Sequence, residues 1–389
     1  MIDYSRVLNE GVKGIKPSGI RKFFDIAESM EDVISLGVGE PDFQTPWAIR
    51  KAGITSLERG KTKYTSNRGL QKLRFAISEY VDRKTGVKYD GDSEILVSVG
   101  GSEAIDLAVR AVVSPGDEVI IPQPSYVCYE PVTLLAGGVP VIIETKAEND
   151  FKLTPKELKA AITPKTKAII LPYPSNPTGA VMGRDDLEKI ADIIRQTDII
   201  VISDEIYSEL TFTEEGHTSI AELDDMRERT VMVSGFSKAF SMTGWRLGYA
   251  CGPGAIIAAM TKIHQFAIMC APTTAQYAAI EALLNCEGAV ADMKTEYNRR
   301  RRLMVAGFNR IGLTCREPKG AFYAFPSIKS TGLTSEEFCE KLLSSQRVAV
   351  VPGTAFGLGG EGFIRASYCY STEHIIEALE RIENFLNTL

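Results

Sequence analysis

Two basic side chains stand out in the stretch "SGFSKAFSMTGWRLG" (234–248), which follows the apolar run "TVMV". Lys238 comes just after a segment with the composition of a buried strand. Burial disfavours the charged form of a lysine, so its amine can act as a nucleophile or a base, for example toward an aldehyde. Arg246, further along, offers a planar guanidinium that suits a phosphate. Taken alone, each residue is equally consistent with a structural role.

Other polar side chains also follow apolar runs. Asp204 follows "IIVIS", where a carboxylate is costly unless it is paired. Its partner could be a structural arginine, a helix N-terminus or a protonated ring nitrogen. Tyr207 would lie near the same face if a helical turn begins there. Because ligands bind beyond the carboxyl ends of strands in a doubly wound sheet, we expect these side chains near one site.

Three turns give weaker signals. "VSVG" leads into "GSEA" and a helical pattern, so that Gly101, Ser102 and the helix N–H groups could hold an anion. Alone, this piece is better explained as a plain strand-to-helix turn. "SNPTG", with Asn176, is a turn by composition. In "PQPSY", Tyr126 could cover a flat cofactor, although one aromatic residue there is more often part of the core.

The elements that position these residues form a recurring pattern. From about residue 46, short runs rich in Ile and Val alternate with amphipathic stretches; the runs are "EILVSVG", "EVIIP", "KAIILPYP", "DIIVISDEIY" and "TVMVSGFSK". The runs show no period of two, which is typical of strands buried on both faces of a parallel sheet. The sequence therefore predicts an α/β fold with a mostly parallel central sheet flanked by helices.

The two ends of the chain have a different texture. Residues 1–45 form an irregular lead-in, and 293–312 predicts a long amphipathic helix whose arginines make a solvated or salt-bridged face. "AFYAFPSI", "RVAVVPG" and "GFIRASYC" predict strands, followed by a C-terminal helix. We expect a large cofactor-binding domain over 46–280 and a smaller α+β domain built from 1–45 and 281–389.

Composition narrows the class of protein. The chain has 389 residues and a formal net charge of −6, which disfavours nucleic acid or an anionic membrane as the main partner. We see neither a signal peptide nor a membrane span in the sequence. Seven scattered cysteines indicate reduced thiols and a cytoplasmic location, and three histidines far apart in sequence disfavour a metal site.

Several familiar motifs can be set aside. "GLGGEG" (357–362) leads into a strand-like run instead of opening a helix, so it lacks the context of a dinucleotide site. The chain has no P-loop and no nucleophile elbow with a histidine behind it.

Read together, the motifs resemble a known family. "GGSEA", "PSY", "SNPTG", "SDEIY", "SKAFSMTGWRLG" and "FIRAS", in this order, resemble the class I pyridoxal-phosphate aminotransferases of fold type I, of the aspartate, aromatic or N-acetyl-diaminopimelate type. The resemblance covers nearly the whole chain, from "SLGVGEPDF" to "FIRASY". Each motif is weak alone, and the combination is specific.

The resemblance implies a role for each matching residue. Lys238 would hold the cofactor aldehyde as an internal imine and shuttle a proton, and Asp204 would pair with the pyridine nitrogen. Tyr207 and Asn176 would bond the ring's phenolic oxygen, and Tyr126 would stack on the ring. The residues implied for the phosphate are Ser102, Ser237, Arg246, Gly101 and Glu103, the last two through their backbone, and Tyr64 from the partner of a homodimer. Those implied for the substrate are Gly39, Asn176 and Arg365, the last clamping its carboxylate.

The implied reaction has ping-pong kinetics, in which an L-amino acid leaves as a 2-oxo acid and a second one, commonly 2-oxoglutarate, takes up the amino group. Two departures from the family pattern limit what the resemblance implies about the phosphate contact and the substrate. Gly235 stands where many relatives have a serine, so either Ser234 or Ser237 could reach the phosphate, and we favour Ser237. Residues 261–276 hold no arginine, so selectivity for acidic side chains does not follow.

Two alternatives use the same fold. A C–S β-lyase would use the same lysine but eliminate at Cβ, and sequence separates it poorly from an aminotransferase. A ligand-sensing regulator would need an added helix-turn-helix segment, for which the first 40 residues leave no room.

Overall fold

A computed structural model of the chain describes residues 2–15, 19 and 30–389. Its centre is a seven-stranded sheet with the order β2-β8-β7-β6-β5-β3-β4. The strands are β2 (Ile95–Ser98), β3 (Glu118–Gln123), β4 (Val139–Glu144), β5 (Thr166–Leu171), β6 (Ile200–Asp204), β7 (Thr230–Gly235) and β8 (Gly248–Cys251). Only β8 runs antiparallel to its neighbours within this sheet, so the prediction of a mostly parallel sheet is confirmed.

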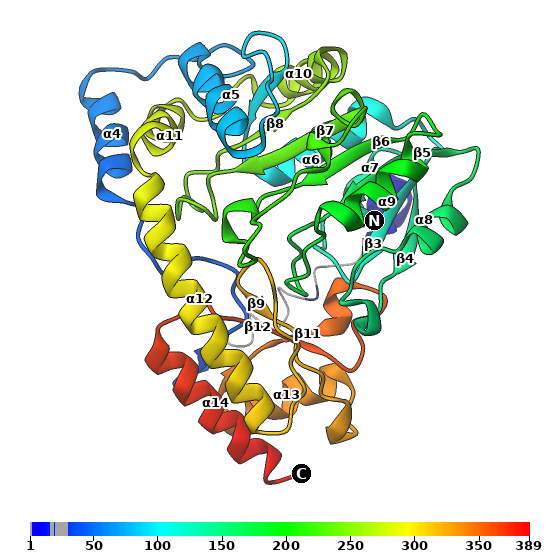
Figure 1. The fold of residues 1–389 in the computed structure, drawn as a ribbon, viewed down its shortest axis with the longest axis vertical. Helices are drawn as coiled ribbons and strands as arrows, with labels where there is room; N and C mark the ends of the chain where they lie inside the picture. The colour runs from blue at the N-terminus through cyan, green and yellow to red at the C-terminus, as the bar shows by residue number, and fades with distance from the viewer. Residues whose placement is uncertain (1, 16–18, 20–29) are drawn as a thin grey trace.

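Helices cover both faces of the sheet, which explains the continuous apolar runs (Figure 1). In β5, Ala168 and Ile170 pack on one face, while Ile169 and Leu171 pack on the other. The first face is covered by α6 (Gly101–Val112), α7 (Tyr129–Leu135) and α10 (Gly254–Ile268). Over the opposite face lie α5 (Gln71–Thr85), α8 (Pro155–Ala161), α9 (Arg184–Ile194) and α11 (Thr273–Asn285), with α4 (Trp47–Glu58) packed on α11.

A second, smaller assembly lies below this body in Figure 1. It contains an antiparallel sheet of β11 (Val351–Pro352), β12 (Ile364–Ser367) and β9 (Tyr323–Ala324), and β1 (Ile34–Ser35) pairs in parallel with β10 (Val348–Ala349). Helices α13 (Ser335–Gln346) and α14 (Thr372–Leu386) pack on it. The long helix α12 (Glu287–Arg310) runs between the two parts, and it begins earlier than the sequence pattern indicated.

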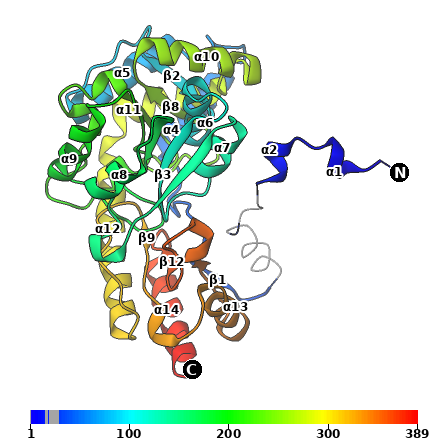
Figure 2. The same ribbon diagram turned by 90° about the vertical axis from the view of Figure 1, so that its right-hand side faces the viewer.

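The N-terminal lead-in can be compared with the structure only in part. Residues 1, 16–18 and 20–29 lie outside the described residues. In the rest, α1 (Tyr4–Val7) and α2 (Glu10–Lys13) project from the side of the molecule near α7 (Figure 2). The short 3₁₀ turns are η1 (Ala147–Asn149), η2 (Ser208–Leu210), η3 (Ile220–Glu222), η4 (Arg227–Arg229), η5 (Lys329–Thr331) and η6 (Gly353–Phe356). No helix in the described part of the chain has the length and apolarity to cross a bilayer.

Candidate active site

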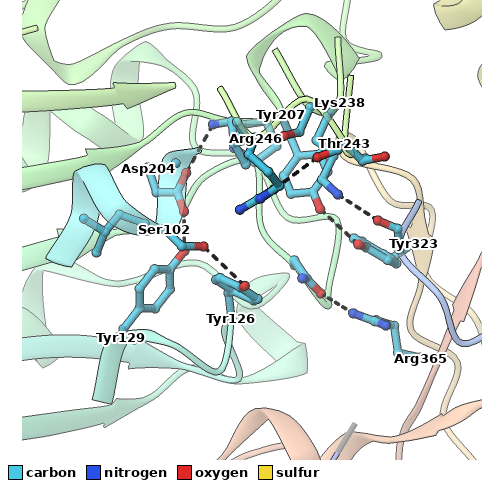
Figure 3. A pocket seen from close by; sticks show the side chains of 17 residues that line it. Ser102, Tyr126, Tyr129, Asp204, Tyr207, Lys238, Thr243, Arg246, Tyr323 and Arg365 are labelled. Atoms are coloured by element: carbon cyan, nitrogen blue, oxygen red, sulfur yellow. Dashed lines mark hydrogen bonds between the residues drawn. The ribbon is translucent and has the colours of Figure 1, made fainter. Parts of the chain in front are cut away.

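A cavity of about 280 Å³ opens at the carboxyl ends of the parallel strands (Figure 3). Parallel strands end at the same edge of a sheet, so loops far apart in sequence meet there. Its walls contain most of the predicted site residues, namely Gly39, Gly101, Ser102, Tyr126, Asn176, Asp204, Tyr207, Ser237, Lys238, Arg246 and Arg365. Tyr129, Thr243 and Tyr323 also line it and were not predicted.

Lys238 lies on the turn after β7 and points into the cavity. Its Nζ donates a hydrogen bond of 2.7 Å to the carbonyl of Gly39 and lies 5.6 Å from the centre of the Phe322 ring. Burial lowers the pKa of Lys238 to about 8. A substantial fraction of this amine is therefore neutral near pH 7 to 8, which is what a nucleophile or a proton acceptor requires.

Asp204 is the last residue of β6 and is 5% exposed. Its carboxylate accepts a hydrogen bond of 2.7 Å from Tyr129 Oη and one of 3.2 Å from the N–H of Ile206. Burial raises the pKa of Asp204, while the bond from Tyr129 lowers it. Among the described residues no cation forms an ion pair with this carboxylate, so its preferred partner is a positively charged group of a ligand.

Arg246 provides positive charge in the cavity wall, beside the start of α6. Its Nη1 donates to the carbonyl of Thr243 at 3.2 Å, and it has no carboxylate within ion-pair distance in the described chain. A Cβ on Gly100 would meet Arg246 Nη2 at 2.8 Å, so the guanidinium lies directly against the N-terminal turn of the helix. A free guanidinium next to a helix N-terminus favours an anion. Ser102 and Ser237 also line the cavity.

Arg365, on β12, provides a second buried guanidinium and is 2% exposed. It donates to Asn176 Oδ1 at 2.8 Å and to the carbonyl of Gly37 at 2.5 Å, while its Nε has no partner in the described structure. The centre of the Tyr323 ring lies 4.4 Å from Cζ of Arg365. Neutral oxygens alone leave its charge uncompensated, so this guanidinium suits a carboxylate of a bound molecule.

Two tyrosines of the cavity wall are joined by a hydrogen bond. Tyr207 Oη and Tyr323 Oη are 2.9 Å apart and share a hydrogen bond. Burial raises the pKa of Tyr207 well above its usual value and that of Tyr323 to about 12, so both are neutral at physiological pH and able to donate. A Cβ on Gly39 would meet Tyr323 Oη at 1.9 Å, so only glycine leaves this approach open.

Two predicted residues lie outside the cavity wall. The Glu103 side chain turns away from it, toward His264 of α10. Tyr64 is 81% exposed on the loop between α4 and α5. Of the two candidate serines, Ser237 lines the cavity, whereas Ser234 Oγ donates to the carbonyl of Glu205 at 3.4 Å and faces a different pocket.

Of the residues that sequence reasoning missed, Tyr129 had a signal in the sequence and Tyr323 had none. Tyr129 is three positions after Tyr126, which is the spacing of one helical turn, and this could have placed both rings near one site. Tyr323 reaches the cavity from a short strand of the smaller sheet, and no local pattern distinguishes it from its aromatic neighbours.

The cavity combines a partly neutral amine, a buried carboxylate without an ion-pair partner among the described residues, and two guanidinium groups. This arrangement suits a ligand with two anionic groups and an electrophilic carbon that meets Lys238. Such a carbon can bond to the amine, and the amine can then move a proton.

Comparisons with known proteins agree with this geometry. Residues 31–382 match the family described as aminotransferase class I and II. An aminotransferase of Bacillus subtilis with no stated substrate is 56% identical over 380 residues, covering 98% of each chain. The aspartate aminotransferase of Pyrococcus abyssi is 48% identical, covering 96% of each chain. The crystal structure of an aromatic aminotransferase from Pyrococcus horikoshii superposes with a TM-score of 0.90 and 47% identity, covering 94% of this chain and 99% of that one.

These matches span nearly the whole chain and exceed what a shared fold alone would give. Class I aminotransferases use pyridoxal phosphate as their cofactor. The chain belongs to the class I and II aminotransferase family of fold type I, and it is a pyridoxal-phosphate enzyme.

Proposed function

We propose that this enzyme moves the amino group of an L-amino acid to a 2-oxo acid such as 2-oxoglutarate, with ping-pong kinetics. The observation that carries this proposal is the position of Lys238 in one cavity with an unpaired buried Asp204 and two guanidinium groups that have no carboxylate partner in the described chain.

The cavity fits pyridoxal phosphate at three points. Arg246, Ser102, Ser237 and the first N–H groups of α6 would hold the phosphate, because positive charge and helix N–H groups meet there. Asp204 would pair with the protonated ring nitrogen, which supplies the cation that this carboxylate lacks. Lys238 would bond to the aldehyde carbon.

The remaining ring contacts come from neutral side chains. Tyr126 would stack on the ring, and Tyr207 and Asn176 would bond its phenolic oxygen. When bound, the cofactor supplies an electron sink that stabilises the charge left on Cα of the amino acid after its proton is removed.

The chain's own residues then carry out the binding and proton steps. Arg365 binds the α-carboxylate of the amino acid with a planar pair of N–H groups, while Gly39 covers it. The amine of Lys238 would take the Cα proton of the amino acid and would later give a proton back. The neutral fraction that burial gives to Lys238 makes it a competent base.

The donor amino acid is proposed only as a class. Relatives named for aspartate and for aromatic amino acids are similar to this chain to nearly the same degree. In the described chain, Lys238, Arg246 and Arg365 are the cavity's cations, and all three already have a proposed partner. We therefore propose an aspartate, aromatic or related donor, N-acetyl-diaminopimelate included.

We also propose a homodimer with the active site at the subunit interface and a cytoplasmic location. Tyr64, the residue expected to reach the partner's phosphate, is almost fully exposed. Its loop is tied to the end of α10, where Asn67 Nδ2 donates to the carbonyl of Met269 at 2.8 Å, and Phe266 on the same helix is 86% exposed. Exposed large apolar side chains of this kind favour a protein partner.

A spectrum and a donor panel test the proposal together. The purified protein should be yellow, Lys238→Ala should remove the visible absorbance of the bound cofactor, and borohydride should fix an adduct on Lys238. Aspartate, phenylalanine and N-acetyl-diaminopimelate, each with 2-oxoglutarate, should yield glutamate for at least one donor. Pyruvate and ammonia from cystathionine, with no amino transfer to 2-oxoglutarate, would show the C–S lyase alternative instead.

A further inference from the structure

Glu103 lies beside the cavity, yet its carboxylate points away from it. The residue is in the first turn of α6, and its Oε2 accepts a hydrogen bond of 2.5 Å from the N–H of Val99. Its Oε1 is 2.9 Å from Nδ1 of His264 on α10. The side chain therefore bridges the turn that precedes α6 and a helix packed against it.

His264 is completely buried, and its Nε2 has no partner in the described structure. An ionised carboxylate can only accept a hydrogen bond. We therefore place the ring proton on Nδ1, which donates a hydrogen bond to Oε1 of Glu103. The described geometry gives the ring no other hydrogen bond. Among the described residues, its polar contact is with Glu103, which holds the turn.

The turn between β2 and α6 is the one that faces Arg246. Ser98 Oγ donates to the carbonyl of Gly100 at 3.0 Å, and a Cβ on Gly248 would meet the Gly100 carbonyl carbon at 2.5 Å and the Gly101 nitrogen at 2.6 Å. Strand β8 thus packs closely against the turn at Gly100 and Gly101. Glu103 accepts a hydrogen bond from the N–H of Val99, where the turn begins. Contacts within the protein therefore hold the turn.

We propose that Glu103 and His264 are positioning residues that preset the Val99–Ser102 turn for the cofactor's phosphate. This inference rests on the proposed function, in which that turn and Arg246 hold the phosphate. Two physical effects support it. A turn that is already ordered loses less conformational entropy on binding. A carboxylate held on His264 and Val99 is kept from facing a phosphate of the same charge.

Cofactor-free enzyme provides a test that does not depend on turnover. Its dissociation constants for pyridoxal phosphate and for pyridoxal, which lacks the phosphate, are measured by absorbance. The ratio of the dissociation constant for pyridoxal to that for pyridoxal phosphate isolates the phosphate contribution, and a smaller ratio means that the phosphate contributes less. We expect Glu103→Ala and His264→Leu each to lower this ratio about tenfold, since a charge-assisted hydrogen bond is lost. His264→Asn, which keeps a donor near the Nδ1 position, should restore most of it.

Glu157→Ala is the matched control. Glu157 occupies the same position in the first turn of α8, where it accepts the N–H of Thr154 at 3.0 Å, and it lies outside the cavity. This variant should lower the melting temperature and leave the ratio unchanged. A ratio equal to the wild-type value in folded Glu103→Ala and His264→Leu would overturn the inference. If Glu103→Ala does not fold, the His264→Leu and His264→Asn pair decides alone.

A further variant separates the two proposals. Arg246→Ala should lower the ratio strongly if the phosphate binds at this wall. If Arg246→Ala lowers it and the Glu103 and His264 variants do not, the positioning role fails while the proposed site stands. If Arg246→Ala also leaves it unchanged, the phosphate does not bind at this wall, and the proposed phosphate site fails with it.

Discussion

At the scale of single residues, burial determines the chemistry of the site. Lys238 and Asp204 lie in the same cavity, and burial moves both pKa values toward neutrality, downward for the amine and upward for the carboxylic acid. The hydrogen bonds from Tyr129 and the Ile206 N–H oppose this shift in Asp204, because they lower its pKa. The amine is kept reactive by the absence of a carboxylate partner within ion-pair distance in the described chain.

The pKa of Lys238 gives a pH prediction. Below about pH 8 the amine is mostly protonated, so the neutral fraction falls about tenfold for each unit of pH. We expect the rate at which cofactor-free enzyme captures pyridoxal phosphate to rise with pH and level off above a midpoint near 8. Stopped-flow absorbance measures this rate, with Lys238→Ala as the blank. A midpoint near 10, the value of an exposed lysine, would contradict it.

The bond from Tyr129 to Asp204 gives a second residue-scale prediction. In Tyr129→Phe the hydroxyl that lowers the pKa of Asp204 is gone, while burial still raises that pKa. Asp204 then ionises at higher pH, so the acid limb of the pH–rate profile should move upward and kcat should fall about tenfold.

Tyr173→Phe is the control for this change. Tyr173 is also buried, but its hydroxyl donates to the carbonyl of Phe151 at 3.1 Å, outside the cavity. It should affect stability and leave the pH profile in place. An unshifted acid limb in Tyr129→Phe would show that the Asp204 charge does not depend on this bond.

At the scale of elements, a covering segment joins the two parts of the molecule. In residues 37–43, the carbonyl of Gly37 accepts from Arg365 and that of Gly39 accepts from Lys238. At the far end, Asp42 Oδ2 lies 2.8 Å from Nη1 of Arg300, a largely buried residue of α12. The segment is therefore fixed to α12, the long helix that runs between the two parts.

Arg300→Met should loosen this segment. It leaves Asp42 without its cation, and we expect a loss of about 1–2 kcal/mol in the free energy of unfolding, less than for a fully buried pair because Asp42 is partly exposed. The KM for the amino donor should rise more than kcat falls, since Gly39 covers the substrate. Denaturant unfolding and steady-state kinetics measure the two effects.

The neighbouring variant Arg299→Met is the matched control, because Arg299 is exposed on the same helix and pairs only with Glu296 among the carboxylates of the described chain. It should change stability less and leave KM unchanged. Equal KM values for the two variants would rule out a role for the Asp42–Arg300 pair in covering the site.

The sequence predicted much of the site because strand ends are visible in it. Lys238 and Asp204 each follow an apolar run, and the rule that ligands bind at the carboxyl ends of parallel strands brings such residues together without knowledge of packing. The sequence could not predict the contact of Tyr129 with Asp204, because this contact depends on the order of the strands in the sheet. Tyr129 follows β3 and Asp204 ends β6, and β5 lies between these two strands.

The direction of a side chain could not be predicted from the sequence either. Glu103 was predicted for its backbone, and only its neighbour on α10, His264, shows where its carboxylate goes. Strand β8 was not predicted, since its "GYAC" run is short and starts with a glycine that lets it approach the Gly100–Gly101 turn. These features depend on tertiary contacts that no local pattern records.

At the scale of the whole molecule, the proposed homodimer assigns the exposed Tyr64 to the active site of the partner chain. If Tyr64 reaches the partner's phosphate, each site of a homodimer takes Lys238 from one chain and Tyr64 from the other. Tyr64→Ala should therefore weaken cofactor retention in both sites, while Lys238→Ala should abolish activity in both.

Mixing the two variants distinguishes a shared site from a self-contained one. After dissociation and reassociation at equal amounts, half of the dimers would be mixed, and each mixed dimer would hold one site with both native residues. Activity at limiting cofactor should then recover to about a quarter of wild type. A self-contained site gives no such recovery, because every chain carries one defect. Activity that stays at the average of the two separate variants would therefore show that Tyr64 does not contribute to the partner's site.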